Sequence, residues 1–332
     1  MHLGAISTVF MTLPLREAAR RLNKLGLKSV EIGAGGYFPK THCDPARLLS
    51  DSAEIDRFRS TLAEFDMEIS ALAMHGEPLS PDPHIAETYD REFRQTCMLA
   101  EKLDVKRLTL VAGLPEGQPG DKAPNWILFS FPPRNVEMYA WQWEERLIPY
   151  WKEHGKIAED HGLRLCFELH PGDMVYNTAT LLRLRDAVGP VAGCLLDPSH
   201  LFWQGADVME VVRVLEGAIY HVHAKDLVVD DHIARVNGVL DPSDFFQLSK
   251  NRSWNFRTVG YGHSETFWRK FISTLRLVGY NDVLSIETED PLTESEESLA
   301  LSAAFLDKIL LRKAPVPLWF QASGQKANAE GQ

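Results

Sequence analysis

The chain has 332 residues, of which 45% are hydrophobic and 24% are charged, as is usual for a soluble globular protein. Its 46 acidic and 35 basic residues give a formal net charge of −11, which repels a phosphate backbone and disfavours nucleic acid as a partner. The length suits one α/β barrel domain as well as two smaller domains.

The cysteines and the N-terminus indicate an intracellular protein. The four cysteines are scattered without a CxxC pair, and buried thiols in a reducing compartment are the simplest interpretation. The N-terminus lacks a basic segment, and the apolar run over residues 3–10 is too short for a signal peptide or a membrane span. We therefore expect a cytoplasmic protein.

Short apolar segments alternate along the chain with segments of helical spacing. We expect strands at Leu3–Val9, Ser29–Ile32, Glu68–His75, Arg107–Ala112, Arg164–His170, Val191–Asp197, Ala218–His223 and Asp282–Glu287. We expect helices at Leu15–Leu25, Ser52–Phe65, Ile85–Leu103, Trp141–His161, Thr178–Val188, Val208–Leu215, Ser264–Val278 and Glu294–Leu311. Eight such units favour a single-domain (β/α)8 TIM barrel over residues 1–312. An open doubly wound sheet is disfavoured, because Gly33-Ala34-Gly35-Gly36 does not fit the GxGxxG phosphate-binding pattern.

Two long connections interrupt this alternation. The first, residues 113–140, follows the fourth strand and holds five prolines together with aromatic residues too apolar for a disordered linker. We expect a lid or a partner-binding element there, and the alternative is a packed decoration without a role. The second, residues 227–261, follows the seventh strand. Residues 313–332 are expected to form a polar tail.

Polar side chains follow the ends of several strands, which is where barrel enzymes have their active sites. In four strands an apolar run leads directly into Glu168, Asp197, His223 or Glu287. Converging carboxylates would repel one another, and a divalent ion bound by these four residues resolves the conflict. Three carboxylates and one imidazole suit an octahedral ion, with Mn²⁺ as the first choice and Mg²⁺ or Co²⁺ as other fits.

This ligand set also predicts a type of reaction. Four protein ligands leave two positions for neighbouring substrate oxygens, such as a carbonyl and a hydroxyl. The ion would then stabilise the metal-bound enediolate that forms when the carbon between these oxygens loses its proton. Glu168 and Glu287 are the candidate acid/base pair, one removing and the other returning a proton. We therefore predict a metal-dependent sugar isomerase or epimerase.

Further polar residues occur near the same strand ends. We expect His200 and Lys225 either to contact substrate oxygens or to orient neighbouring metal ligands. His75 and Glu31 are expected to line the floor or wall of the substrate pocket. His170 is either a base outside the metal shell or a strand-end residue without a role. No phosphate cradle is evident, which favours a non-phosphorylated sugar.

Five motifs, four of which contain residues named above, carry a resemblance to known proteins: Glu168-Leu169-His170-Pro171, Asp197-Pro198-Ser199-His200, His223-Ala224-Lys225-Asp226, Gly260-Tyr261-Gly262 before Trp268, and Ile286-Glu287. Together they resemble the sugar phosphate isomerase/epimerase family, the xylose isomerase-like TIM barrels, over nearly the whole chain. The resemblance implies Mn²⁺ ligation by the four strand-end residues, acid/base catalysis by the two glutamates among them, and a substrate contact by His200. Such families often carry an arginine shortly after the seventh strand, and Arg235 and Arg257 are the candidates here, with Arg257 as our choice for substrate binding.

The aromatic insertion, the segment Glu168–Gly172 and the segment Arg257–His263 look more like one subgroup, which includes the large subunit of C-glycoside deglycosidases. That resemblance implies a lyase on 3-oxo-glycosides that uses the same metal site, with His170 as base and a small second subunit as partner. A homo-oligomer formed through the insertion is the other partner that we expect.

Two further readings are less favoured. The endonuclease-four-like nucleases share the barrel, but they need a histidine after strand four, where this chain has Ala112. A non-catalytic sugar-binding protein is the alternative from another functional class. It is less favoured because binding alone does not require four metal ligands that leave coordination positions open.

Overall fold

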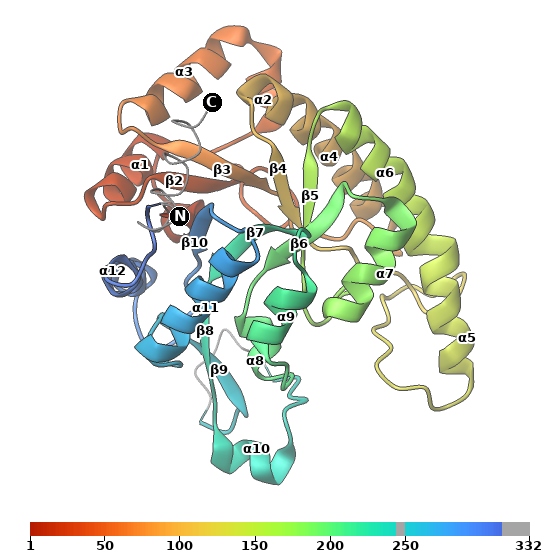
Figure 1. Cartoon of the computed structure of the whole chain (residues 1–332). Coiled ribbons are helices and arrows are strands. Elements are labelled where there is room, and N and C mark those ends of the chain that lie inside the picture. The colour runs from red at the N-terminus through yellow and green to blue at the C-terminus, as the bar shows by residue number, and fades with distance from the viewer. Residues whose placement is uncertain (244–249, 314–332) are drawn as a thin grey trace, which may run out of the picture.

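The structure, a computed structural model, describes residues 1–243 and 250–313, which form a closed barrel of eight parallel strands (Figure 1). The strand order around the barrel is β1-β10-β7-β6-β5-β4-β3-β2, and the predicted TIM barrel is confirmed. Apart from residue 313, the expected polar tail lies outside the described residues. The barrel strands are β1 (His2–Ile6), β2 (Ser29–Gly33), β3 (Glu68–Ala73), β4 (Arg107–Leu110), β5 (Arg164–Glu168), β6 (Ala192–Leu196), β7 (Ile219–Ala224) and β10 (Val283–Ile286).

Helices cover the outside of the barrel (Figure 1). The helices of the described residues are α1 (Leu15–Lys24), α2 (Pro45–Ser50), α3 (Ser52–Ala63), α4 (Pro83–Leu103), α5 (Arg134–Trp141), α6 (Ile148–Asp160), α7 (Thr178–Val188), α8 (Ser199–Phe202), α9 (Val208–Val214), α10 (Asp231–Asn237), α11 (Glu265–Leu277) and α12 (Ser295–Asp307). Of these, α5 and α10 lie in the two long connections, away from the barrel wall (Figure 1). A 3₁₀ turn over Ser7–Phe10 follows β1, and a π-helical turn over Gln142–Leu147 joins α5 to α6. Among the described residues, no helix is both long and apolar enough to cross a membrane. The four cysteines are buried as free thiols.

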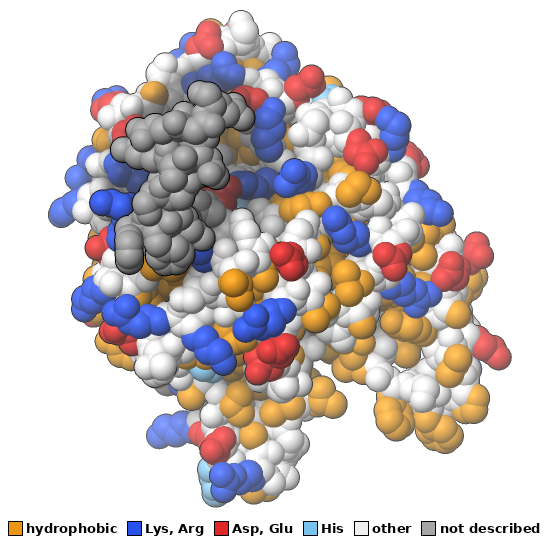
Figure 2. All heavy atoms as spheres, viewed as in Figure 1, with side chains coloured by type: hydrophobic (Ala, Val, Ile, Leu, Met, Phe, Trp, Pro, Cys, Tyr) orange, Lys and Arg blue, Asp and Glu red, His pale blue; other side chains and the backbone are white. Residues whose placement is uncertain are grey.

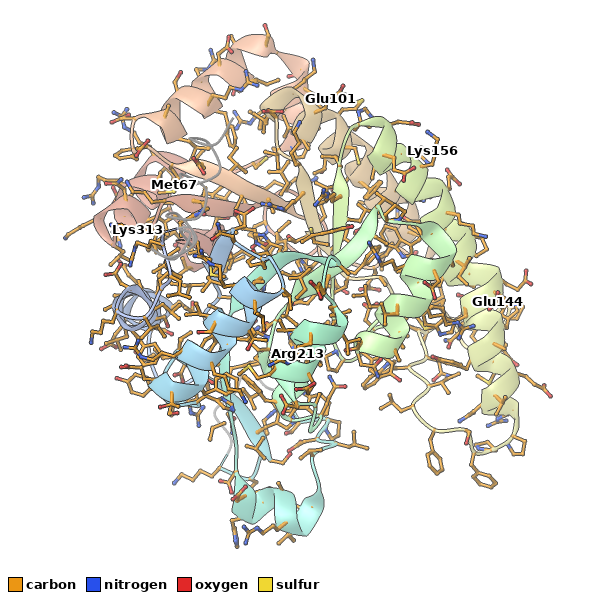
Figure 3. All side chains as sticks on the ribbon, in the orientation of Figure 1. Met67, Glu101, Glu144, Lys156, Arg213 and Lys313 are labelled. Carbon is orange, nitrogen blue, oxygen red and sulfur yellow. The ribbon has the colours of Figure 1, made fainter. Side chains whose placement is uncertain are left out.

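Several barrel strands end earlier than the sequence predicts. β3 ends at Ala73 instead of His75, and β5 ends at Glu168 instead of His170. Pro171 explains the second difference, because a proline lacks an amide hydrogen and restricts the residue before it. Figure 3 shows all side chains on the ribbon, and those of the barrel strands are mostly buried, so the strand ends lie over a packed core and not over a pore.

The connection after β4 is more regular than the sequence predicts. The helix α5 occupies its last part, so the prediction of an irregular segment up to residue 140 is wrong. Gln142 Nε2 donates to three backbone carbonyls within residues 115–125 at 2.8–3.3 Å, which ties the loop to the helical segment. The ring of Trp126 meets Tyr176 edge-on, with centroids 5.5 Å apart. The insertion is therefore packed against the barrel.

The connection after β7 forms a hairpin of β8 (Asp226–Val229) and β9 (Trp254–Arg257), and α10 lies at its tip (Figure 1). Trp203 stacks on Trp254 with ring centroids 5.1 Å apart, which gives the hairpin an aromatic core of its own. Residues 244–249 of this connection lie outside the described part of the chain. Both long connections follow C-terminal strand ends, so they flank the end of the barrel where the polar residues lie.

The buried carboxylate of Asp226 anchors the loop between β9 and α11. It accepts hydrogen bonds from the amides of Gly260, Gly262 and His263 at 2.9–3.1 Å. The side chains of His263 and Trp268 donate to it at 2.7 and 3.3 Å. We expect Asp226→Asn to lower the free energy of unfolding by about 3 kcal/mol, because its amide would turn an N–H toward these donors. Urea denaturation measures the change.

Asp290 offers a matched control for this prediction. Its Oδ2 accepts two hydrogen bonds from Thr258, one from the amide at 2.7 Å and one from the hydroxyl at 2.9 Å. Because fewer donors contact this carboxylate, Asp290→Asn should lower the free energy of unfolding by about half as much as Asp226→Asn. Equal losses in the two variants would contradict the anchoring role of Asp226.

Candidate metal centre

Four side chains meet at the C-terminal end of the barrel, each contributed by one of four adjacent strands. Glu168 is the last residue of β5 and His223 lies in the last part of β7, while Asp197 and Glu287 directly follow β6 and β10. Each offers one ligand atom, and these four atoms lie within 4.8 Å of one another. The four residues that the sequence groups together are therefore neighbours in space.

Three imidazoles surround the carboxylate of Glu168. His75 Nε2 lies 3.0 Å from its Oε2, while His200 Nε2 and His223 Nδ1 lie 3.4 and 3.7 Å from its Oε1. Burial raises the pKa of Glu168, but the proximity of these imidazoles outweighs burial and holds the pKa well below its usual range. Glu168 is therefore ionised at neutral pH.

The ammonium group of Lys225 lies at one side of the cluster and is almost fully enclosed. Its Nζ is 3.2 Å from Glu287 Oε2, 3.9 Å from Asp197 Oδ2 and 2.5 Å from Glu289 Oε2. It also lies 4.2 Å from the centroid of the Phe256 ring, in a cation–π contact. Burial raises the pKa of Glu287, but the charge of Lys225, followed by that of a neighbouring imidazole, outweighs burial and brings the pKa to about 2.

Several buried atoms of the cluster form no hydrogen bond within the described part of the chain. They are Asp197 Oδ2, His200 Nε2, His223 Nδ1 and Glu287 Oε2. Buried polar atoms of folded proteins are nearly always paired, and a bound ion is a recognised reason for an exception. Carboxylate and imidazole donors are those that divalent cations accept, and the ion's charge would relieve the repulsion between the carboxylates. The residues present therefore fit a divalent metal ion.

A second polar layer lies behind His223 and is centred on Glu31, in the middle of β2. The carboxylate of Glu31 pairs with His221 Nε2 at 2.9 Å and His223 Nε2 at 3.0 Å, and it accepts the hydroxyls of Thr109 and Ser285 at 2.6 and 2.9 Å. Glu31 is fully buried, so the expectation that it lines the substrate pocket is corrected. An ionised carboxylate can only accept, so the contact with Glu31 favours the tautomer of His223 with its proton on Nε2 and directs Nδ1 to the ion site.

We expect Glu31→Gln to weaken divalent-ion binding by about 10- to 100-fold, because the amide no longer fixes the orientation and tautomer of His223. Competition with a fluorescent chelator measures the affinity. Thr109→Val is the matched control, since it removes one hydrogen bond to the same carboxylate and leaves the contact with His223 in place. An unchanged affinity in the Glu31→Gln variant would contradict the orienting role.

The histidines predicted around the site lie where the sequence places them, at the cluster. His75 and His200 contact Glu168, as described above. The ring centroid of His170 lies 4.4 Å from that of His200. Burial, followed by the positive charge of His200, lowers the pKa of His170 to about 3, so this imidazole is neutral at neutral pH.

Arg257 was predicted to bind substrate, whereas His221 and Glu289 were not predicted to take part in the site. Arg257 donates to the carbonyl of Phe256 at 2.7 Å and lies 3.9 Å from Asp290, and its expected contact with substrate stays a prediction. His221 and Glu289 received no role from the sequence. Both lie two residues from a predicted ligand. For His221, which shares β7 with His223, that spacing places both side chains on one face of the strand and could have identified it.

The insertion carries exposed hydrophobic side chains, which gather on the lobe around α5 in Figure 2. Phe129 and Phe131 are 71% and 70% exposed, and Val136 on α5 is 56% exposed. Exposed apolar groups of this size often mark a contact surface. The role of the insertion as a partner surface stays a prediction.

Comparison with known proteins assigns the chain to a family. A family model described as xylose isomerase-like TIM barrel matches residues 19–309. YfiH of Bacillus subtilis, a protein without an established activity, is 38% identical over 301 residues, which cover 90% of this chain and 95% of YfiH. An inosose dehydratase of Bacillus cereus is 30% identical over 154 residues, which cover 45% of this chain and 48% of that enzyme.

Solved structures share the fold at lower identity. The structure of the IolI protein with a bound zinc atom has a TM-score of 0.65 and 18% identity, and it matches 95% of this chain and 100% of that one. An L-ribulose 3-epimerase has a TM-score of 0.62 and 16% identity, and it matches 100% of this chain and 98% of that one. With its closed barrel and its match over residues 19–309, this chain belongs to the xylose isomerase-like TIM barrel family.

Proposed function

We propose that the protein is a divalent-metal-dependent enzyme that removes a proton from a carbon next to a carbonyl group, and so isomerises or epimerises a sugar. The observation that carries this proposal is the convergence of three carboxylates and an imidazole within 4.8 Å, at the barrel end where such enzymes act. Their buried atoms without hydrogen bonds support a bound cation.

Glu168, Asp197, His223 and Glu287 would hold the ion. We propose Mn²⁺ because carboxylate oxygens dominate the donor set, and Mg²⁺ or Co²⁺ would fit the same donors. When bound, the ion would supply a positive charge that polarises a carbonyl oxygen and stabilises negative charge beside it.

Glu168 and Glu287 are the proposed proton carriers. They come from β5 and β10, which are separated by two other strands of the barrel, so they approach the centre from different sides. Both carboxyls have pKa values below their usual range, and both are therefore ionised and ready to accept a proton at neutral pH. In an isomerisation, the glutamate that removes the proton would return it to the neighbouring carbon. In an epimerisation, the other glutamate would first take up a proton from solvent and then deliver it to the opposite face of the same carbon.

His200 and Lys225 would hold substrate oxygens in place. The Nε2 atom of His200 is buried and unpaired, so it has a hydrogen bond to offer. The fixed charge of Lys225 would favour negative charge on a nearby oxygen. His75 acts through Glu168, since its Nε2 lies 3.0 Å from that carboxylate and fixes its position.

A lyase is the second candidate function, and the neutral imidazole of His170 is the observation that favours it. An unprotonated base beside His200 could take the proton while a leaving group departs from the neighbouring carbon. The partial likeness to inosose dehydratase is consistent with an elimination. The substrate would be a 3-oxo-glycoside such as a C-glycoside, and a small second subunit would bind the exposed aromatic side chains of the insertion.

Deuterium exchange from solvent tests the proposed function. Protein loaded with Mn²⁺ is incubated in D₂O with ketoses and, separately, with 3-oxo-glycosides. We expect deuterium at the carbon next to the carbonyl, with an epimer or isomer as product for the first candidate and a released aglycone for the second. A sugar-binding protein would bind these compounds without exchange, and absence of exchange with all of them while the ion is bound would rule out proton abstraction.

A further inference from the structure

Glu289 is a carboxylate at the centre that lies outside the group of four converging ligand atoms. It comes two residues after Glu287, and its side chain is 30% exposed, against 16% for Glu287 and 3% for Lys225. Its Oε2 lies 2.5 Å from the Nζ atom of Lys225, which is the shortest of the three carboxylate contacts of that ammonium group. Glu289 therefore stands on the solvent side of Lys225.

This placement changes the charge that an arriving substrate meets. One divalent ion and Lys225 match the charge of the three ligand carboxylates, and Glu289 adds a further carboxylate 2.5 Å from Lys225. In a mostly buried site the field of such a charge is weakly screened over a few ångströms. A phosphate or carboxylate group on the substrate would be repelled, while hydroxyl groups would meet ready acceptors.

Other basic side chains around the centre have carboxylate partners of their own. His200 Nε2 lies 3.4 Å from Glu168 Oε1 and 3.5 Å from Asp197 Oδ2, and Arg257 lies 3.9 Å from the carboxylate of Asp290.

We propose that Glu289 is a specificity-determining residue, which neutralises Lys225 and thereby restricts the site to uncharged polyhydroxylated carbonyl compounds. Sugar phosphates and sugar acids are excluded. The substrate class named in this inference rests on the proposed function. The predicted effect of Glu289 on anion binding does not depend on turnover.

The test is a titration of inorganic phosphate into protein that carries one equivalent of Mn²⁺ and is freed of excess ion. Calorimetry compares the wild type with Glu289→Gln. We expect phosphate to bind the variant about tenfold more tightly, because Lys225 regains an uncompensated charge. Glu289→Asp keeps the charge and should behave like the wild type. Glu216→Gln, at an exposed position before β7 and so at the opposite end of the barrel, controls for the change in net charge.

Two further variants make the outcome decisive. The double variant Glu289→Gln/Lys225→Met should lose the gain in phosphate affinity, since the gain must act through the ammonium group. Glu289→Ser serves as a second neutral replacement if Glu289→Gln does not take up the ion. The proposal is overturned if the neutral variants bind phosphate with the affinity of the wild type. It is also overturned if Glu216→Gln raises the affinity for phosphate as much as the neutral variants do. Because no turnover is needed, this result is independent of whether deuterium exchange is observed.

Discussion

Replacement of Glu287 by Gln is expected to lower the rate of proton abstraction by about 10³-fold, because the amide cannot accept a proton from the substrate carbon. The pKa of about 2 means that Glu287 is ionised throughout the neutral range, so the wild type needs no prior loss of a proton. The substitution is isosteric, and the fold should be retained. Deuterium exchange in D₂O measures the rate, and circular dichroism checks the fold.

Asp197→Asn separates the two roles assigned to Glu287, which are ion binding and proton transfer. Asp197 belongs to the same ligand group, but it is not a proposed proton carrier. Excess Mn²⁺ should therefore restore much of the activity of Asp197→Asn and little of that of Glu287→Gln. Wild-type turnover by Glu287→Gln with the ion bound would exclude Glu287 as a base.

Removal of the divalent ion is expected to abolish exchange and to lower the thermal stability. Without a cation, three buried carboxylates face one another, and Lys225 balances them in part. An ion present at 100 times its dissociation constant stabilises the folded state by about 2.7 kcal/mol, which corresponds to a melting temperature higher by several degrees. Dialysis against a chelator followed by calorimetry and by exchange measurements tests both effects.

Readdition of ions provides the control for this experiment. Mn²⁺ should restore exchange and melting temperature together, since both depend on the same four ligands. Full exchange in protein shown to be free of metal would contradict the assigned role of the centre, and so would identical melting curves with and without the ion.

The barrel and the convergence of its four candidate metal ligands could be predicted because the relevant pattern is local. Each ligand follows an apolar run, and parallel strands in a barrel bring their C-terminal ends together whatever the details of helix packing. Glu168, Asp197, His223 and Glu287 therefore converge without any knowledge of long-range contacts. His200 and Lys225 lie within three residues of these ligands and were located by the same argument.

How deep a polar side chain lies inside the barrel could not be predicted in the same way. Glu31 is the third of five residues in β2, whereas Glu168 is the last residue of β5. Glu31 therefore lies one layer below the surface of the site, where it pairs with His221 and His223. The layer depends on the register between strands, which composition and periodicity do not reveal.

The contacts of the two long connections depend on chain segments far apart in sequence. Asp226 anchors residues 260–263 more than thirty positions away, and Arg257 lies against Asp290. Neither pairing has a local pattern, so the expected substrate contact of Arg257 could not be checked from sequence. The helix α5 did have a local signal, because Pro132 and Pro133 precede its first residue and proline favours helix starts.

Anomalous diffraction at the manganese edge, from crystals grown with Mn²⁺, tests the central claim most directly. We predict one peak within bonding distance of Glu168, Asp197, His223 and Glu287, bound to His223 through Nδ1. Glu31, His221 and His223 form the other group of candidate ligands in the described residues. A peak in that second group, or no peak near the four strand-end residues, would contradict the assigned metal centre.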